Sequence, residues 1–290
     1  MPTATEIAPK LSIADTIRKV SSIATLPEVT AKIVATVEDP NSSPASLHKI
    51  VCHDPALVTR ILKVVNSAFY GLPGQIASIE RAIVLLGLNA VKNIAVAASL
   101  GQLFRGVKLC EGFTARDLWT HCIAVGVTAR ELAKQMRIPL VDEAFLAGMI
   151  HDVGILVSLQ VYPDRLAMAC EAARNEGRSF SAVEQELIGV DHQQLGMALA
   201  EHWKFPRSCQ LVAGYHHRPT VFGEDHRLLV TLVYIADTLC CQAKQGFNLT
   251  ALNQALDAAA IGEMSLDMAV IERVGTNIQQ LVSSSATIFQ

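Results

Sequence analysis

The chain has 290 residues, of which 51% are hydrophobic, and a formal net charge of -3 at pH 7. This length allows one large or two moderate domains with a sizeable core. The small net charge, without a block of Lys and Arg, argues against direct binding to a nucleic-acid backbone. Seven cysteines without a C-x-x-C spacing indicate reduced thiols rather than a disulfide framework or a zinc knuckle.

The mean hydropathy of +0.33 is high, yet charged residues interrupt every apolar stretch before it reaches the roughly 20 residues of a membrane span. Arg105 ends the run 93–104, and His151 with Asp152 interrupts the run after Ala144. The N-terminal sequence MPTATEIAPK lacks the basic start and apolar block of a secretory signal. We therefore expect no membrane association and a cytoplasmic location.

Helical periodicity continues along nearly the whole sequence, and no run alternates as a strand would. We therefore predict an all-α protein. In the first half, Ser43-Pro44 and Asp54-Pro55 each place a capping side chain ahead of a proline at the first helical position. Ser78 marks another helix start, and Gly87 separates one short helix from the next.

In the second half, Ser181 and Glu184 form a capping-box pattern. The segment RGVKLCEGFT, 105–114, is the predicted seam between the halves because it carries two glycines between periodic segments. We therefore predict an N-terminal helical subdomain over 11–113 and a second helical subdomain over 114–290. The helices of the second subdomain are predicted near 114–136, 142–160, 163–176, 191–203, 206–217, 226–243 and the C-terminus.

Histidines and carboxylates recur in this second half at spacings that suit a metal site. Asp117 and His121 are four residues apart, so they lie on one face of a helix. His151 and Asp152 are adjacent, and adjacent side chains diverge by about 100° on a regular helix. They can bind one site together only near a helix end, where Gly154 could loosen the geometry.

His216 and His217 precede Arg218-Pro219 at another predicted helix end. Asp237 lies within a predicted helix among apolar neighbours; it either belongs to the site or is a buried carboxylate bonded to a helix end or an Arg. Nitrogen and oxygen donors of this kind suit divalent iron, manganese or zinc. One ion could bind, or two ions that share a carboxylate. The candidate ligands are Asp117, His121, His151, Asp152, His192, His216, His217 and Asp237. We expect His48, His53, His202 and His226 to be surface or capping residues.

The order of these histidines and aspartates resembles the HD superfamily of metal-dependent phosphohydrolases. The first half, from LPEVTAKIVATV through NSAFYG to SIERAIVLLG, is similar to the HDOD family, the HD-related output domain of bacterial signalling proteins. The resemblance covers roughly 18–240, with further helices at the C-terminal end. It implies an N-terminal helical subdomain packed on a degenerate HD-type bundle in a cytoplasmic signal-transduction protein.

The resemblance also implies that the chain acts as a stand-alone regulatory module that binds partner signalling proteins. Compared with HD-GYP phosphodiesterases, Asp117 stands where a glutamate is common, Ile155 replaces a lysine, and RPTVFGEDH stands where the GYP loop would follow His217. The lost lysine removes a cationic phosphate contact, which Arg218 could replace. These departures favour the regulatory module over an enzyme.

The alternative is a metal-dependent phosphohydrolase or phosphodiesterase acting on a nucleotide or cyclic dinucleotide, with catalysis carried by Asp152 and a metal-bound water. In that case His121, His151, Asp152 and Asp237 would hold one ion, and His192, His216 and His217 a second. A third interpretation joins the two, because a metal or nucleotide ligand at this site could shift helix packing and tune partner affinity. Homodimerisation is compatible with the apolar composition.

Overall fold

The computed structural model describes residues 12–21, 26–37, 39–67, 70–104, 106–221, 223 and 226–286. Residue 11, the first of the predicted N-terminal subdomain, and residue 105, the first of the predicted seam, lie outside these ranges. The NSAFYG and RPTVFGEDH segments are described only in part.

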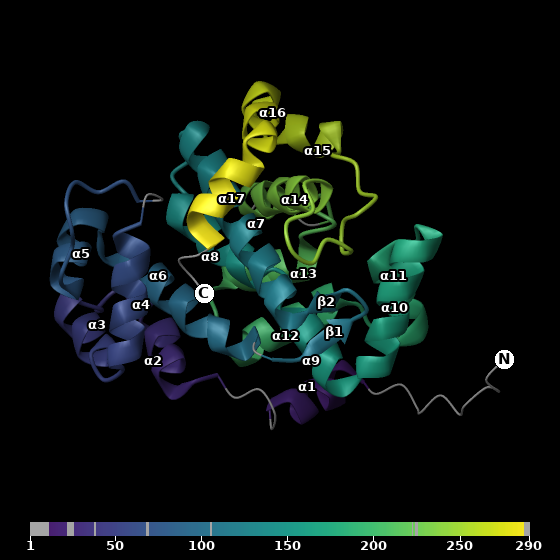
Figure 1. The fold of residues 1–290 in the computed structure, drawn as a ribbon, viewed down its shortest axis with the longest axis horizontal. Coiled ribbons are helices and arrows are strands. Elements are labelled where there is room, and N and C mark those ends of the chain that lie inside the picture. The colour runs from purple at the N-terminus through teal and green to yellow at the C-terminus, as the bar shows by residue number, and fades with distance from the viewer. Residues whose placement is uncertain are drawn as a thin grey trace.

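The helices of the N-terminal half begin where the local capping signals predict. Ser43 Oγ accepts a hydrogen bond from the backbone N–H of Ser46, and Asp54 caps the following helix in the same way. Gly87, with φ 89°, separates two consecutive helices. The elements are α1 Ile13–Ser21, α2 Glu28–Val37, α3 Pro44–Val51, α4 Pro55–Val65, α5 Ile79–Leu86 and α6 Leu88–Leu100, with α2 to α5 at the left of Figure 1.

Helix α6 joins the two halves of the molecule. Every residue from 90 to 100 is buried, because α6 packs against α2, α4 and α5 on one side and against a helix of the second half on the other. Asn93 adds a polar contact, since its Nδ2 donates to the Asp142 carbonyl at 3.0 Å. A single hydrophobic core therefore runs through both halves.

A 3-10 turn and a small antiparallel hairpin link the halves. The turn is η1 Gly101–Phe104, and the hairpin is β1 Lys108–Cys110 with β2 Phe113–Thr114, paired Lys108 to Thr114 and Cys110 to Phe113. These are the only strands among the described residues. The protein is therefore all-α, as predicted, with a short hairpin inside the predicted seam.

The second half is a bundle around the long helix α7 (Figure 1). Helix α7 packs on α8, α14 and α17, while α12 packs on α9 and α13. The predicted helix 142–160 is wrong in one respect, because it is two helices that meet at His151 and Asp152. The bundle comprises α7 Ala115–Gln135, α8 Val141–Ile150, α9 Val153–Val161, α10 Pro163–Glu176, α11 Phe180–Leu187, α12 His192–His202, α13 Arg207–Tyr215, α14 Arg227–Gln242, α15 Ala258–Glu263, α16 Met268–Thr276 and α17 Ile278–Ala286.

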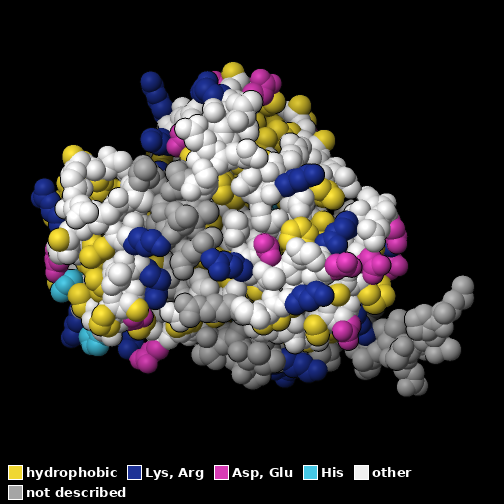
Figure 2. Space-filling model, viewed as in Figure 1, with side chains coloured by type: hydrophobic (Ala, Val, Ile, Leu, Met, Phe, Trp, Pro, Cys, Tyr) yellow, Lys and Arg dark blue, Asp and Glu magenta, His cyan; other side chains and the backbone are white. Residues whose placement is uncertain are grey.

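The segment Val141–Val161 is long and apolar enough to cross a membrane by length and composition, but 89% of its most apolar window is buried inside the fold. It forms α8 and α9 in the core of the bundle. On the face drawn in Figure 2, the described Lys and Arg side chains are interspersed with Asp and Glu, and hydrophobic side chains show in small groups. No extended field of one charge sign covers the described part of this face.

Candidate metal centre

Seven of the eight candidate ligands converge in the middle of the bundle. They come from the body of α7, the junction of α8 and α9, the first residue of α12, the end of α13 and the middle of α14. Their side chains are fully buried, except for one histidine that is 8% exposed. The seven are His121, His151, Asp152, His192, His216, His217 and Asp237, with His217 the partly exposed one.

The junction of α8 and α9 is what allows adjacent residues to join one cluster. Helix α8 ends at Ile150, and Asp152, with φ -98° and ψ 15°, leaves the helical conformation before α9 begins at Val153. The sequence suggested that Gly154 loosens this junction, but the structure gives this residue a different role. A Cβ at Gly154 would lie 1.9 Å from the carbonyl oxygen of His192, so this glycine permits α9 to approach α12 closely.

Asp152 lies between two groups of histidines. Its Oδ2 is 3.3 Å from His151 Nε2 and 3.8 Å from His121 Nε2. Its Oδ1 is 3.4 Å from His216 Nε2 and 3.6 Å from His192 Nε2. Neither oxygen has a hydrogen-bond partner among the described residues. One carboxylate therefore presents a separate oxygen to each of two imidazole sets.

Asp237 and His217 complete the two sets. Asp237 Oδ1 is 3.1 Å from His121 Nε2 and 3.8 Å from His151 Nε2. On the other side, the Nε2 atoms of His192 and His217 are 3.1 Å apart. One ligand atom from each of His192, His216 and His217 lies within 4.8 Å of the other two, and the same holds for His121, His151 and Asp237.

All five histidines are fixed by oxygen acceptors on their Nδ1 atoms. Three of them donate from Nδ1 to a backbone carbonyl: His121 to Gln245 at 3.1 Å, His151 to Gly148 at 2.7 Å and His216 to Val212 at 3.1 Å. The remaining partners are Glu184 for His192, at 2.5 Å, and the Gln254 amide oxygen for His217, at 3.0 Å. Because these oxygens accept only, each Nδ1 carries a proton and each Nε2 is directed into the cluster.

Glu184 is a site residue that the sequence pattern assigned to a capping box with Ser181. The N-cap of α11 is instead Ser179, whose Oγ accepts from the backbone N–H of Ala182. Glu184 is fully buried, and its Oε2 accepts from both the backbone N–H and Nδ1 of His192. In the sequence, the only indication of this role was that Glu184 lies eight residues before the candidate ligand His192.

The loop after α14 also holds the site through contacts that no local pattern reveals. Gln245 supplies the carbonyl that accepts from His121, and Phe247 N donates to the Asp117 carbonyl at 3.0 Å. Gly246, with φ +67°, passes so close to α7 that a Cβ would lie 2.3 Å from the Asp117 carbonyl oxygen. Only glycine fits this crossing without strain.

The electrostatics keep both buried aspartates ionised. Burial would raise the pKa of Asp152, but His151, His216 and His192 lower it well below its usual value. Burial likewise opposes ionisation of Asp237, whose pKa is lowered by the hydrogen bond from His121 and by His217. Two carboxylates in a fully buried site require nearby positive charge, which a protonated imidazole or a metal ion supplies.

The histidines differ in their protonation. Burial lowers the pKa values of His216 and His217, and neighbouring imidazoles lower them further, so both are neutral at pH 7. Burial would also lower the pKa of His192, but Glu184 and Asp152 raise it to about 9. The proton on His192 accounts for the close approach of the two Nε2 atoms of His192 and His217, and a cation could take its place.

The metal-ligand prediction for Asp117 is corrected by the structure. Asp117 lies at the third position of α7, and its Oδ2 accepts from the backbone N–H and the hydroxyl of Thr114, at 2.7 and 2.6 Å. This reciprocal capping box holds the carboxylate at the helix start, one turn from His121. The four-residue spacing correctly predicted that Asp117 and His121 lie on one helix. It did not predict that only His121 belongs to the cluster.

The remaining seven residues fit a pair of divalent metal ions. Nε2 of His151 and His216, both oxygens of Asp152 and Oδ2 of Asp237 are buried without a hydrogen-bond partner among the described residues. Such orphaned polar atoms are costly unless a ligand satisfies them. Imidazole and carboxylate donors suit iron, manganese or zinc. One set is His121, His151, Asp152 and Asp237, and the other is His192, His216, His217 and Asp152.

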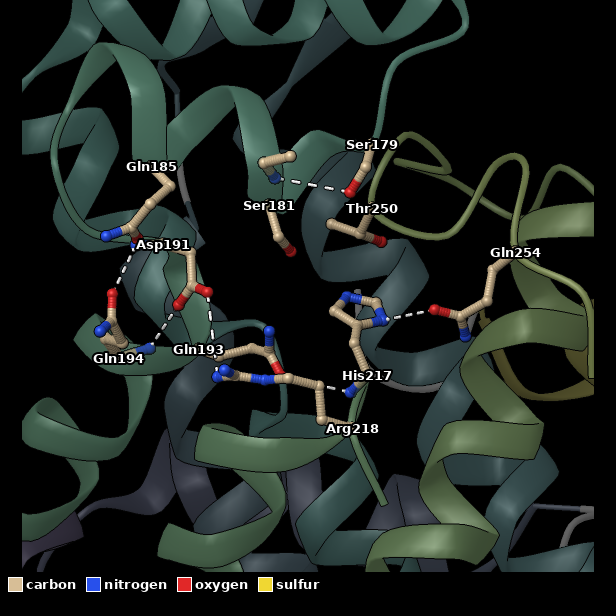
Figure 3. A pocket seen from close by; sticks show the side chains of 11 residues that line it. Ser179, Ser181, Gln185, Asp191, Gln193, Gln194, His217, Arg218, Thr250 and Gln254 are labelled. Carbon is tan, nitrogen blue, oxygen red and sulfur yellow. Dashed lines mark hydrogen bonds and ion pairs between the residues drawn. The ribbon is translucent and has the colours of Figure 1, made fainter. Parts of the chain in front are cut away.

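A polar pocket of about 490 Å³ opens beside this cluster (Figure 3). Of the cluster residues, His217 alone lines it, with its ring hydrogen bonded to Gln254. Arg218 extends along the wall toward Asp191, with 3.9 Å between Nη2 and Oδ2, and its side chain is 46% exposed. Ile155 is fully buried, and Arg218 is the cationic side chain among the described residues that line this pocket.

Comparison with known proteins gives a family match, one longer relative and solved structures with the same fold. The HDOD domain model matches residues 23–219. An uncharacterized protein of Treponema pallidum (strain Nichols) is 26% identical over 227 residues, which are 78% of this chain but only 43% of that longer protein. The chain thus spans less than half the length of this relative.

Two solved structures share the fold over nearly their full lengths. An HDOD domain protein of unknown function from Geobacter sulfurreducens has a TM-score of 0.80 at 20% identity, covering 94% of this chain and 97% of its own. A proposed phosphohydrolase from Shewanella amazonensis SB2B has a TM-score of 0.73 at 23% identity, covering 95% and 98%. At these identities the likeness establishes the fold alone.

Proposed function

Because this chain belongs to the HDOD family and retains seven converging HD-type ligands, we propose that it is a divalent-metal-dependent phosphohydrolase for a small phosphate ester. The observation that carries the proposal is the orientation of the five histidines. Each Nδ1 is held by an oxygen acceptor. Four of the five Nε2 atoms lie 3.3–3.8 Å from the Asp152 carboxylate, which offers one oxygen to each side, and the fifth, of His217, lies 3.1 Å from His192 Nε2. A site that served packing alone would not need this arrangement.

Each part of the site has a chemical role in this proposal. Two divalent ions would neutralise phosphate charge and lower the pKa of a water molecule. Asp152 would bridge the ions, and Glu184 and Gln245 would keep His192 and His121 in the correct tautomer. Arg218 would bind phosphate oxygens at the pocket wall. The pocket volume of about 490 Å³ is in the range of small-molecule sites.

The test compares the wild type with Asp152→Ala and with Asp117→Ala as a matched control. Metal content is measured by elemental mass spectrometry, and hydrolysis is measured on phosphomonoesters, nucleotides and cyclic dinucleotides. We expect up to two equivalents of metal and turnover in the wild type and in Asp117→Ala, and loss of both in Asp152→Ala. A wild type that binds two ions and hydrolyses none of these substrates would contradict the enzymatic proposal.

A second candidate is the regulatory module that binds partner signalling proteins in the cytoplasm. The specific support is that six of the seven ligands are fully buried, so the metals would be far from open solvent, and that Ile155 offers no phosphate contact. In this case the metal centre fixes the packing of α7, α9, α12, α13 and α14. Metal binding without turnover, together with a change in partner or nucleotide affinity on metal loading, would favour this candidate.

A further inference from the structure

Two cysteines lie together outside the metal centre, between the hairpin and α10. Cys110 ends β1 and Cys170 is in α10, with side chains 4% and 1% exposed. Cys110 Sγ donates to the Glu111 carbonyl at 3.7 Å, and β1 packs directly on α10. Both cysteines line a separate pocket of about 430 Å³, whose wall includes Glu111 and Arg174. Two buried cysteines on packed elements therefore border the same pocket.

The surroundings favour a reactive thiolate on Cys110. The neighbouring Cys170 thiol lowers the pKa of Cys110, burial opposes this, and the Arg174 guanidinium lowers the pKa further. Arg174 is held over the hairpin by its hydrogen bond to the Glu111 carbonyl and by its contact with the Phe113 ring. By contrast, burial raises the pKa of Cys240 to about 12. Thiolate character of this kind marks reactive cysteines.

We propose that Cys110 and Cys170 are a peroxide-sensitive thiol pair that oxidises to a disulfide joining β1 to α10. The Cys110 thiolate attacks one oxygen of hydrogen peroxide, forming a sulfenic acid and releasing hydroxide, which takes the thiol proton to give water. The Cys170 sulfur then attacks the sulfenic sulfur, and the hydroxyl group leaves with the Cys170 proton as a second water. Two thiols and one peroxide thus give one disulfide and two waters.

The location connects this pair to both sides of the candidate metal centre. The hairpin leads directly into α7, which carries His121, and α10 packs on α11, which carries Glu184. A bond from β1 to α10 would tie these two segments together. The proposal itself rests on the thiols and their pocket, and it holds whether or not the metal centre is catalytic.

The test exposes the full chain to hydrogen peroxide, alkylates the remaining thiols and maps peptides without reduction. We expect a cross-linked peptide pair containing Cys110 and Cys170, and simultaneous loss of both thiols. Cys110→Ser should abolish the cross-link. Cys170→Ser should abolish it as well and leave a sulfenic acid on Cys110, which a dimedone probe labels.

Cys52→Ser is the matched control, because Cys52 is exposed and lies on the N-terminal half. Its removal should leave the cross-link unchanged. The proposal is overturned if Cys52 is oxidised while Cys110 and Cys170 both remain open to alkylation after denaturation. It is also overturned if Cys110 is linked to a cysteine other than Cys170.

Discussion

Glu184 shows how a single buried side chain can control the site without being a ligand. It accepts two hydrogen bonds from His192, and its buried charge fixes the proton on Nδ1 of that histidine. Replacing the carboxylate by an amide of the same size keeps the packing but weakens this orientation. Partners of this kind typically change metal affinity more than they change the fold.

We therefore predict that Glu184→Gln weakens metal affinity about 10- to 100-fold. Isothermal titration of metal-free protein with zinc or manganese measures the effect. Glu186→Gln is the control, because Glu186 is in the same helix with its side chain 59% exposed and paired to Arg178. Equal affinities in the two variants would show that Glu184 has no role in orienting His192.

Asp117 illustrates the opposite case, a residue whose spacing suggested a ligand and whose carboxylate caps a helix. Asp117→Ala removes half of the capping box of α7, since the Thr114 N–H and hydroxyl lose their acceptor. We expect the free energy of unfolding to fall by about 1 kcal/mol in urea denaturation. Metal stoichiometry should stay that of the wild type, and a loss of bound metal would contradict the assignment as a cap.

At the scale of elements, close packing between helices sets the geometry of the cluster. Gly154 of α9 faces the backbone of α12, and an added Cβ would lie 1.9 Å from the His192 carbonyl oxygen and 2.6 Å from Gly196 N. Both contacts are backbone atoms, so they cannot be relieved by a rotamer change. The two helices would have to move apart, carrying Asp152 away from His192.

We predict that Gly154→Ala lowers the free energy of unfolding by about 3 kcal/mol, as overpacking does at tight contacts. Urea denaturation monitored by circular dichroism measures it. Gly262→Ala in α15 is the control, because nothing lies within 4 Å of its added Cβ. That variant should gain about 0.5–1 kcal/mol from the better helix propensity of alanine. Similar destabilisation in both variants would argue against the close contact.

The helix starts were predictable because their signals are local. Ser43, Asp54 and Ser78 cap the helices that follow them, as their sequence context indicates. The break at His151 and Asp152 was not predictable, because AFLAGMIHDVGILVSL reads as one apolar helix without proline. The break arises where these side chains meet groups from α7, α12, α13 and α14, which is a tertiary effect.

At the scale of the whole molecule, the candidate cluster depends on contacts between distant parts of the chain. The order of histidines and aspartates pointed to seven of its members, since a set of donors in that order is unusual. Gln245 and Gln254, which orient His121 and His217, lie in a loop with no motif of their own. Their roles follow only from the way this loop crosses α7 and α14.

Because the ligands come from α7, the junction of α8 and α9, α12, α13 and α14, metal binding should stabilise the entire bundle. An ion that binds only the folded state adds RT ln(1 + [L]/Kd), about 2.7 kcal/mol at a free concentration of 100 Kd. The continuous core through α6 should extend this effect to the N-terminal half. A single thermal transition should therefore shift upward by several degrees on adding zinc or manganese, and return with a chelator.

Calorimetry with and without metal measures this shift, and Asp152→Ala provides the comparison. That variant loses the carboxylate that faces both imidazole sets, so its transition should not move on metal addition. An equal shift in the variant would mean that the ion binds elsewhere. A transition that splits on metal addition, with one part unchanged, would mean that the N-terminal half unfolds independently of the bundle and that α6 does not transmit the stabilisation.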